Sequence, residues 1–337
     1  MTAKLAEVRR LEQAVRDNSA SKMELFRKRG QLLPRERVER LLDRGQPFIE
    51  LSTLAGYQMH DDDGGNNIMG GGSIVGIGVV AGRRVLVSAS DSGIKGGSIP
   101  PMGLKKALRL HEIAFENRLP LIYLVESGGA NLLYQSEMFV EGGRSFANQA
   151  RLSAAGIPQI AIVHGSSTAG GAYLPGLSDY VVLVRKRSKI FLAGPPLVKA
   201  AIGEDADDEA LGGADLHGQV TGLGEYVAEN DIEAIAYGRA IVEQLGWDEA
   251  SPRGAVEPPH LDGAGLLGIV VTVLAIVALV SGGGAWLLGA AHSVHIGASG
   301  LVFGYLTYLM ARGLFARNLL YLLGGVVVFM VYGGVLW

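Results

Sequence analysis

The sequence contains no cysteine, few aromatic residues and almost no charge in its C-terminal segment. The lack of cysteine excludes a disulfide framework, thiolate zinc sites and cysteine nucleophiles. The net charge of −3 provides no basic field that would draw the chain to nucleic acid, so no nucleic-acid partner is expected. Glycine, by contrast, is abundant, with 49 residues in a chain of 337. This length predicts about two domains.

Charge is divided unevenly along the chain. After His260 the only formal charges are Asp262, Arg312 and Arg317. The remaining stretches are each long enough, or nearly so, to cross a bilayer core, and they predict membrane spans at residues 264–291, 297–316 and 319–337. Three such stretches in succession leave nothing polar to face water, which disfavours buried helices of a globular domain as the alternative.

The two arginines predict the orientation of this membrane segment (264–337). They flank the connection between the second and third spans, and positive charge favours the cytoplasmic side. Counting back along the chain places residues 1–250 in the cytoplasm, with a multi-pass anchor behind them. Residues 251–263 contain three prolines without periodicity and are predicted to be a linker.

Residues 1–250 alternate between helical and strand patterns. The first 45 residues are predicted to be helical, forming an arm that packs on the core or on a partner. Strands are expected at 74–80, 84–89, 119–125, 160–163 and 180–184, and helices at 102–117, 146–155 and 232–245. This alternation predicts an α/β domain with a largely parallel sheet. The continuous apolar run at 119–125 indicates a strand covered on both faces.

Two glycine-rich turns follow predicted strands: ESGGAN at 126–131 and SSTAGGAY at 166–173. Glycine lets backbone approach a ligand closely and can adopt positive φ. Two such turns can direct backbone N–H donors at one oxygen, which is the arrangement that stabilises a thioester enolate. Composition alone leaves tight turns that merely pack as the alternative.

Other chemistry has little support in the sequence. No phosphate-binding GxxxxGK[ST] loop is present, and no motif of a metal cage occurs in residues 1–260, so no metal is expected. His164 and His217 lie near glycines, but a histidine at a strand end is more often structural than a base. Glu126 and Asp91 end apolar strands, as caps or as polar walls of a site.

Several long segments together carry a family resemblance: GGGSIVGIG (70–78), IKGGSIPPMGLKKALRLHEIAFENRLPLIYLVESGGANL (94–132), IPQIAIVHGSSTAGGAYLP (157–175), IFLAGPPLVKAAIGE (190–204) and LGGADLH (211–217). In this order they resemble the carboxyltransferase (β) subunit of biotin-dependent acyl-CoA carboxylases of the methylcrotonoyl-, propionyl- or acetyl-CoA type. The resemblance covers residues 1–250. It implies a ClpP/crotonase-like α/β superhelix, here the N-terminal carboxyltransferase domain.

The resemblance also implies an activity and its residues. Such subunits move a carboxyl group from carboxybiotin to the α-carbon of an acyl-CoA. Backbone N–H groups around the thioester enolate would come from the two turns, namely Gly170 and Gly171 with Gly129 and Ala130 beside them. The segment expected to lie along the CoA is Lys95, Gly96, Gly97 and Ser98.

Partners follow from the same resemblance. Carboxybiotin would be carried by the biotin carboxylase/biotin carrier (α) subunit, and the chain would form homo-oligomers or join full-length β subunits. Family members have a second crotonase-like half that binds biotin, whereas this chain leaves the pattern near Gly246. We therefore expect it to bind acyl-CoA without transferring carboxylate by itself.

The tail has a resemblance of its own. HSVHIGASG (292–300) and LVFGYLTYLMARGLFAR (301–317) are similar to the GxSG span of rhomboid-like intramembrane serine proteases, with Ser299 in the nucleophile position. A serine nucleophile needs a base, and no histidine follows His295. The alternative is that the small residues serve close helix packing. A hybrid of two truncated genes, with no function of its own, is a further alternative; were the tail an artefact, the protein would be cytoplasmic.

Overall fold

The computed structural model describes residues 2–59, 69–247, 268 and 272. The chain divides into two units, of which the first is Met1–Ser251. The predicted linker and, apart from residues 268 and 272, the three predicted spans lie outside the described residues. Within the described ranges, no helix is both long and apolar enough to cross a membrane.

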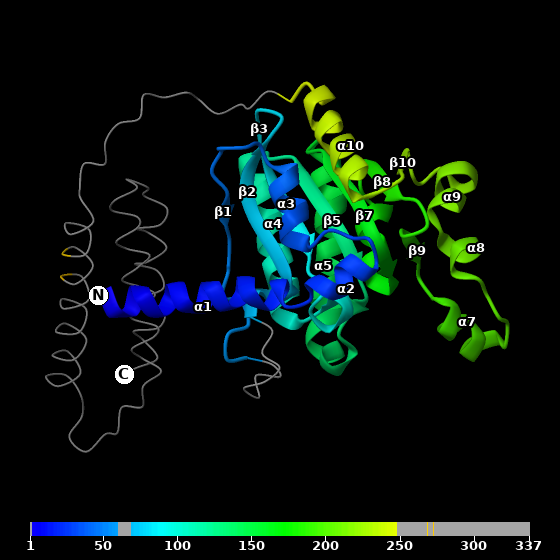
Figure 1. Ribbon diagram of the computed structural model, residues 1–337, viewed down its shortest axis with the longest axis horizontal. Coiled ribbons are helices and arrows are strands. Elements are labelled where there is room, and N and C mark those ends of the chain that lie inside the picture. The colour runs from blue at the N-terminus through cyan, green and yellow to red at the C-terminus, as the bar shows by residue number, and fades with distance from the viewer. Residues whose placement is uncertain (1, 60–68, 248–267, 269–271, 273–337) are drawn as a thin grey trace, which may run out of the picture. The chain divides into compact units, whose positions relative to one another are not determined.

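One mixed sheet forms the frame of the first unit (Figure 1). Its strands follow the order β1-β2-β3-β5-β7-β8-β10, and β9 pairs with β7. The strands from β3 to β10 pair in parallel, and β1, β2 and β3 are antiparallel. The bounds are β1 Ile49–Glu50, β2 Ser73–Val80, β3 Arg83–Ser90, β5 Leu121–Ser127, β7 Gln159–Thr168, β8 Tyr180–Val184, β9 Lys189–Phe191 and β10 Tyr226–Ala228. The prediction of an α/β domain with a largely parallel sheet is confirmed.

Helices cover both faces of this sheet. The α-helices described are α1 Thr2–Ala20, α2 Met23–Lys28, α3 Pro34–Leu41, α4 Pro101–Asn117, α5 Gln135–Ala154, α6 Tyr173–Gly176, α7 Pro195–Ile202, α8 Asp208–Gly212, α9 Ala214–Leu216 and α10 Asp231–Gln244. Shorter helical turns are η1 Met69–Gly72, η2 Lys95–Gly97, η3 Leu132–Tyr134, η4 Ala169–Ala172 and η5 His217–Thr221. A second, two-stranded sheet pairs β4 (Ser98–Ile99) with β6 (Gly129–Ala130).

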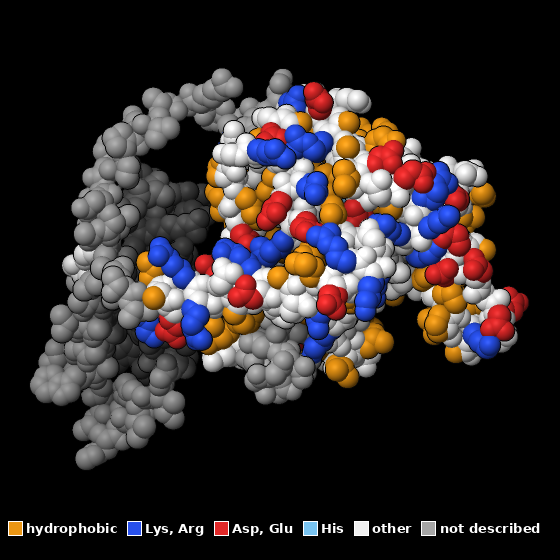
Figure 2. Space-filling view, viewed as in Figure 1, with side chains coloured by type: hydrophobic (Ala, Val, Ile, Leu, Met, Phe, Trp, Pro, Cys, Tyr) orange, Lys and Arg blue, Asp and Glu red, His pale blue; other side chains and the backbone are white. Residues whose placement is uncertain are grey.

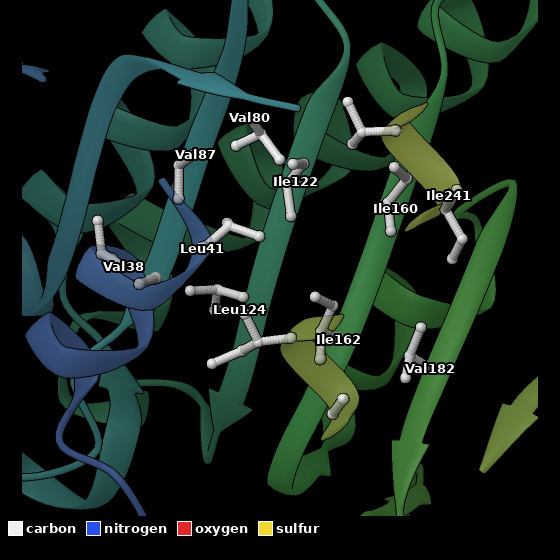
Figure 3. Close-up of a cluster of buried hydrophobic side chains, with 14 of the residues drawn as sticks. Val38, Leu41, Val80, Val87, Ile122, Leu124, Ile160, Ile162, Val182 and Ile241 are labelled. Atoms are coloured by element: carbon white, nitrogen blue, oxygen red, sulfur yellow. The ribbon is translucent and has the colours of Figure 1, made fainter. Parts of the chain in front are cut away.

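Two hydrophobic layers form because successive residues of a strand point to opposite faces. In β5, Ile122 and Leu124 pack against Val38 and Leu41 of α3 and against α10 (Figure 3). The alternate residues of β5 pack with α4 and α5 in the other layer. All seven residues of β5 are buried, and the five that belong to the apolar run at 119–125 confirm the prediction of a strand covered on both faces.

The N-terminal region is largely helical, as predicted for the first 45 residues. It contains three helices, α1, α2 and α3. Along α1, charged and apolar side chains are largely exposed, and Figure 2 shows basic and acidic groups mixed over this face. The carboxylate of Glu12 accepts a hydrogen bond from Thr53 Oγ1 at 3.0 Å, which ties α1 to the loop that follows β1.

Candidate active site

The two glycine turns lie at the same edge of the sheet. β5 leads into Gly128–Gly129, and β7 leads into η4, which contains Gly170 and Gly171. Because β5 and β7 are parallel neighbours, their carboxyl ends meet at one edge. Each turn runs into a short 3-10 helix, η3 or η4, before the next α-helix begins.

Close approach between the turns requires residues without side chains. A Cβ added at Gly129 would lie 3.1 Å from Thr168 O, and one added at Gly171 would lie 2.8 Å from Ser127 Oγ. Gly129 also has φ of +83°, and Ala169 has φ of +50° although it carries a side chain. Such backbone is strained outside glycine and is found preferentially at functional sites. These observations argue against the alternative that the two segments are tight turns that only pack.

Ser127 is hydrogen-bonded within this arrangement. Gly129 N–H donates to Ser127 Oγ at 3.1 Å, and Ser127 Oγ donates to Gly97 O at 3.4 Å. The N–H of Gly129 is therefore already partnered inside its own turn. Ser167 Oγ donates to Gly171 O at 2.9 Å and so fixes the second turn from within.

The segment predicted to lie along CoA, Lys95 to Ser98, packs against the first turn. Ser98 pairs with Gly129, and Ile99 with Ala130, in the parallel β4–β6 ladder. Gly128 N–H donates to Gly97 O at 3.1 Å. A Cβ at Gly97, whose φ is +77°, would lie 2.6 Å from Glu126 O, so only glycine fits this approach. The structure thus brings together all three segments that the sequence selects.

A pocket of about 430 Å³ opens beside these turns. Its walls come from the carboxyl ends of β5 and β7, from the loop after β3, and from α2 with the residues immediately before and after it. The lining residues are Lys22, Leu25, Arg29, Ser92, Gly93, Gly96, Glu126, Ser127, Gly128 and Ser166. Sequence reasoning missed Lys22, Leu25 and Arg29, because no local pattern places the N-terminal helices over this edge. It also did not select Ser92 and Gly93 in the loop after β3.

The two candidate histidines are structural. His164 is fully buried, and its Nδ1 lies 3.0 Å from Asp231 Oδ1. Burial, followed by the charge of Arg37, lowers the pKa of His164, so the ring is neutral and donates through Nδ1 to Asp231. His217 has partners on both nitrogens, Thr221 Oγ1 at 3.0 Å and Ile190 O at 2.9 Å. Neither ring lies among the residues that line the pocket.

An aromatic pair lies beside the second glycine turn, and the remaining predictions for the site concern metal ions and Ser299. Phe146 of α5 stacks on Tyr173 at 4.4 Å between ring centroids, and Phe146 Cζ is the atom nearest to a Cβ added at Gly170. Among the described residues, no group of three His, Asp or Glu side chains could hold a metal ion. Ser299 and the rest of the predicted protease segment lie outside the described residues, so their assignment stays a prediction.

Comparison with known proteins identifies the family. A family model described as the carboxyl transferase domain matches residues 26–266, and the chain therefore belongs to the carboxyl transferase domain family. It is 49% identical over 272 residues to a probable biotin-dependent acyl-coenzyme A carboxylase beta2 subunit of Mycobacterium tuberculosis, covering 80% of this chain and 50% of that protein. It is 46% identical over 279 residues to a probable mitochondrial methylcrotonoyl-CoA carboxylase beta chain of Drosophila melanogaster, covering 77% and 48%.

A solved structure agrees with these relatives. The beta subunit of P. aeruginosa geranyl-CoA carboxylase matches with a TM-score of 0.71 and 58% identity, over 80% of this chain and 50% of that one. The resemblance to acyl-CoA carboxylase β subunits is thus confirmed. This chain spans about half the length of the relatives it matches. The family model ends at residue 266, before most of the predicted membrane segment, and none of these findings supports the rhomboid-like resemblance of the tail.

Proposed function

We propose that the chain is the acyl-CoA-binding part of the carboxyltransferase subunit of a biotin-dependent acyl-CoA carboxylase. The observation that carries this proposal is the convergence of Gly97–Ser98, Gly128–Ala130 and Ala169–Gly171 at one sheet edge. Glycine at 97, 129 and 171 lets these three backbone segments pack closely on one another, and an added Cβ at Gly170 would have only Phe146 Cζ within 4 Å. Membership of the carboxyl transferase domain family supports the same conclusion.

The proposed role of the chain is to stabilise negative charge on the thioester oxygen. Carboxylation requires loss of a proton from a carbon conjugated with the thioester carbonyl, and backbone N–H donors held in place before the reaction stabilise the resulting oxyanion. We assign this role to Gly170 and Gly171. Gly129 shapes the turn, since its N–H is partnered by Ser127 Oγ. The carboxyl group itself would come from carboxybiotin held by a partner subunit.

The acyl group and the partners are also proposed from relatives. Two of the proteins that the chain resembles are named for methylcrotonoyl-CoA and geranyl-CoA, both of which are 3-methyl-2-enoyl thioesters. We propose a substrate of this class, a biotin-carrying α subunit as partner, and assembly with further β subunits. We also propose that residues 1–250 form the carboxyltransferase domain and that residues 251–263 form a linker behind it.

Membrane association of the C-terminal segment is proposed from the sequence alone. Residues 264–337 contain two formal charges, Arg312 and Arg317, and three apolar stretches of near-spanning length. In this proposal the segment holds the carboxyltransferase unit at the cytoplasmic face of a membrane.

Thioester binding tests the proposed function. The full chain, purified in mild detergent, is titrated with 3-methylcrotonyl-CoA by calorimetry. We expect saturable binding by the unmodified chain and at least a tenfold loss of affinity in Gly170→Ala. The added methyl group has only Phe146 Cζ within 4 Å, at 3.9 Å, so it preserves the fold while adding bulk at a proposed oxyanion donor.

Two further variants complete this experiment. Gly171→Val removes binding as well, although its Cβ also collides with Ser127 Oγ, so its folding is checked by circular dichroism. Gly142→Ala on α5 is the matched control, because nothing lies within 4 Å of its added Cβ. Affinity in Gly170→Ala equal to that of the control would refute the assignment of the oxyanion donors.

A further inference from the structure

A group of buried polar side chains lies under the carboxyl ends of β5 and β7, on the face of the sheet that α3 and α10 cover. We call it the buried ion cluster, and its members are Gln31, Arg37, Glu126, His164 and Asp231. They come from the segment before α3, from α3, β5 and β7, and from the first residue of α10. Each member is more than nine-tenths buried. None was predicted to act together with another.

Arg37 is the centre of the cluster. Its Nη1 donates to Glu126 Oε2 at 2.9 Å, and its Nε lies 3.4 Å from Asp231 Oδ2. Asp231 also accepts from Leu32 N–H at 2.8 Å and from His164 Nδ1 at 3.0 Å. Burial alone would raise the pKa of Asp231, but the hydrogen bond from His164 and the positive charge of Arg37 hold it below its ordinary value.

Gln31 closes the cluster on its other side. Its Nε2 donates to His164 O at 2.9 Å and to Glu126 Oε1 at 3.3 Å. The ends of β5 and β7 are therefore bridged by one amide from the N-terminal region. Arg29 adds a longer ion pair to Glu126, with 3.9 Å between Nη1 and Oε1.

Burial of these ionised groups has a desolvation cost that apolar side chains at the same positions would not have. Buried ion pairs lose about as much by desolvation as they gain by attraction, and apolar residues of similar volume are often as stable or more so. The neighbouring positions on the same face, Ile122, Leu124 and Ile162, are apolar. Three atoms of the cluster, Gln31 Oε1, Arg37 Nη2 and His164 Nε2, have no hydrogen-bond partner. Stability alone does not account for the cluster.

Glu126 links the cluster to the candidate active site. It lines the pocket and immediately precedes Ser127 and the first glycine turn. Its side chain packs on β7, where a Cβ at Gly165 would lie 2.7 Å from Glu126 Cδ. Its backbone carbonyl packs on Gly97. One residue thus contacts β7 with its side chain and the Gly97 segment with its backbone, while the chain leads directly into the first turn.

We propose that Glu126, held by Arg37 and Gln31, is a positioning residue that sets the separation of the two glycine turns. This inference rests on the proposed function, because the turns are taken to bind the thioester oxygen. Glu126 itself takes no part in proton transfer, since Arg37 and Gln31 hold both of its carboxylate oxygens. Disturbing it should weaken recognition of the thioester carbonyl and spare recognition of the CoA portion.

The test compares affinities for 3-methylcrotonyl-CoA and for CoA without an acyl group, using the full chain. In the unmodified chain the ratio of the two affinities measures how strongly the thioester is recognised. We expect Glu126→Gln, which keeps the shape but removes the charge that pairs with Arg37, to lower this ratio at least tenfold. We expect Gln31→Ala, which unpairs no charge, to fold and to lower the ratio about threefold or more.

Asp179→Asn provides the matched control. The Asp179 carboxylate accepts from Gln159 N–H and from Ser153 Oγ, both at 2.8 Å, at the opposite end of β7. The Asp179→Asn substitution should lower the free energy of unfolding measured with urea but change the ratio of the two affinities by less than twofold. A ratio unchanged in both Glu126→Gln and Gln31→Ala, or lowered equally in Asp179→Asn, overturns the positioning role. Failure of the unmodified chain to bind either ligand refutes the proposed function, and this inference with it.

Discussion

At the scale of single residues, His111 shows how burial makes stability depend on pH. The ring is 2% exposed, its Nε2 lies 2.9 Å from Tyr123 OH, and burial lowers its pKa to about 4. The unfolded chain would titrate this group near its ordinary value of 6.5. Between these two values the unfolded state binds more protons than the folded state, so stability falls as pH falls through this window.

The corresponding prediction concerns unfolding by urea at pH 7 and pH 4.5. We expect His111→Gln to lose less stability on acidification than the unmodified chain, by about 2–3 kcal/mol, since each pKa unit is worth about 1.4 kcal/mol. The glutamine side chain can still bond Tyr123 OH, so the comparison isolates protonation. Equal losses in the two proteins would show that His111 is not held neutral. His164 acts in the same direction and remains in both proteins.

Individual residues also show what the sequence could and could not predict. The glycines at 128–129 and 170–171 could be selected because each pair lies in a glycine-rich turn that follows an apolar strand pattern. The ion pairs of Arg37 with Glu126 and Asp231 could not be predicted, because 89 and 194 residues separate the partners along the chain. Such pairs depend on which strands become neighbours, and nothing in the local pattern encodes that.

At the scale of elements, α10 approaches the sheet closely because it carries Gly238. A Cβ at this position would lie 2.4 Å from Ile162 Cδ1 of β7. Alanine favours a helix over glycine by about 0.5–1 kcal/mol, but this gain is opposed where the core has no room.

We therefore predict coupling between Gly238 and Ile162. Gly238→Ala should be destabilising by about 1 kcal/mol in the unmodified chain, because the methyl group overpacks the interface. In an Ile162→Val background, which lacks the Cδ1 atom, the same change should become neutral or stabilising, with a coupling energy above about 0.5 kcal/mol. Urea unfolding of the four proteins completes the cycle. Additive effects would show that α10 can shift away from β7 without cost.

Element boundaries were harder to predict than the elements themselves. β5 and α4 lie where the patterns indicate, but α5 begins at Gln135, well before the predicted start at 146. Gly142 and Gly143 interrupt the helical pattern, and the helix continues through them while Met138 is buried against Leu104 and Leu108 of α4. Tertiary packing overrides local propensity here. The segment from β9 to η5 has little hydrophobic periodicity, so the sequence predicts no elements there.

At the scale of the whole molecule, the order of strands assembles the site. β3, β5 and β7 are parallel neighbours, so the chain returns to the same edge after each of them. The segment after β3 supplies Gly97, the segment after β5 supplies Gly129, and the segment after β7 supplies Gly171. Local patterns predict each strand but not their order. The family resemblance was therefore needed to predict that these three segments meet.

The distribution of charge along the chain leads to a last prediction. If residues 264–337 associate with membranes, the full chain will sediment with membranes and resist extraction by alkaline carbonate. Raising pH and ionic strength removes proteins held by charge, whereas burial of apolar residues, at about 25 cal/mol per Å², is unaffected. Substituting aspartates at Val270 and Leu274, in the middle of the first predicted span, should weaken retention, since each charge costs about 2.5–3.5 kcal/mol there. The same substitutions at the exposed Lys4 and Arg9 on α1 are the control. Complete release of the unmodified chain by carbonate would exclude an integral anchor.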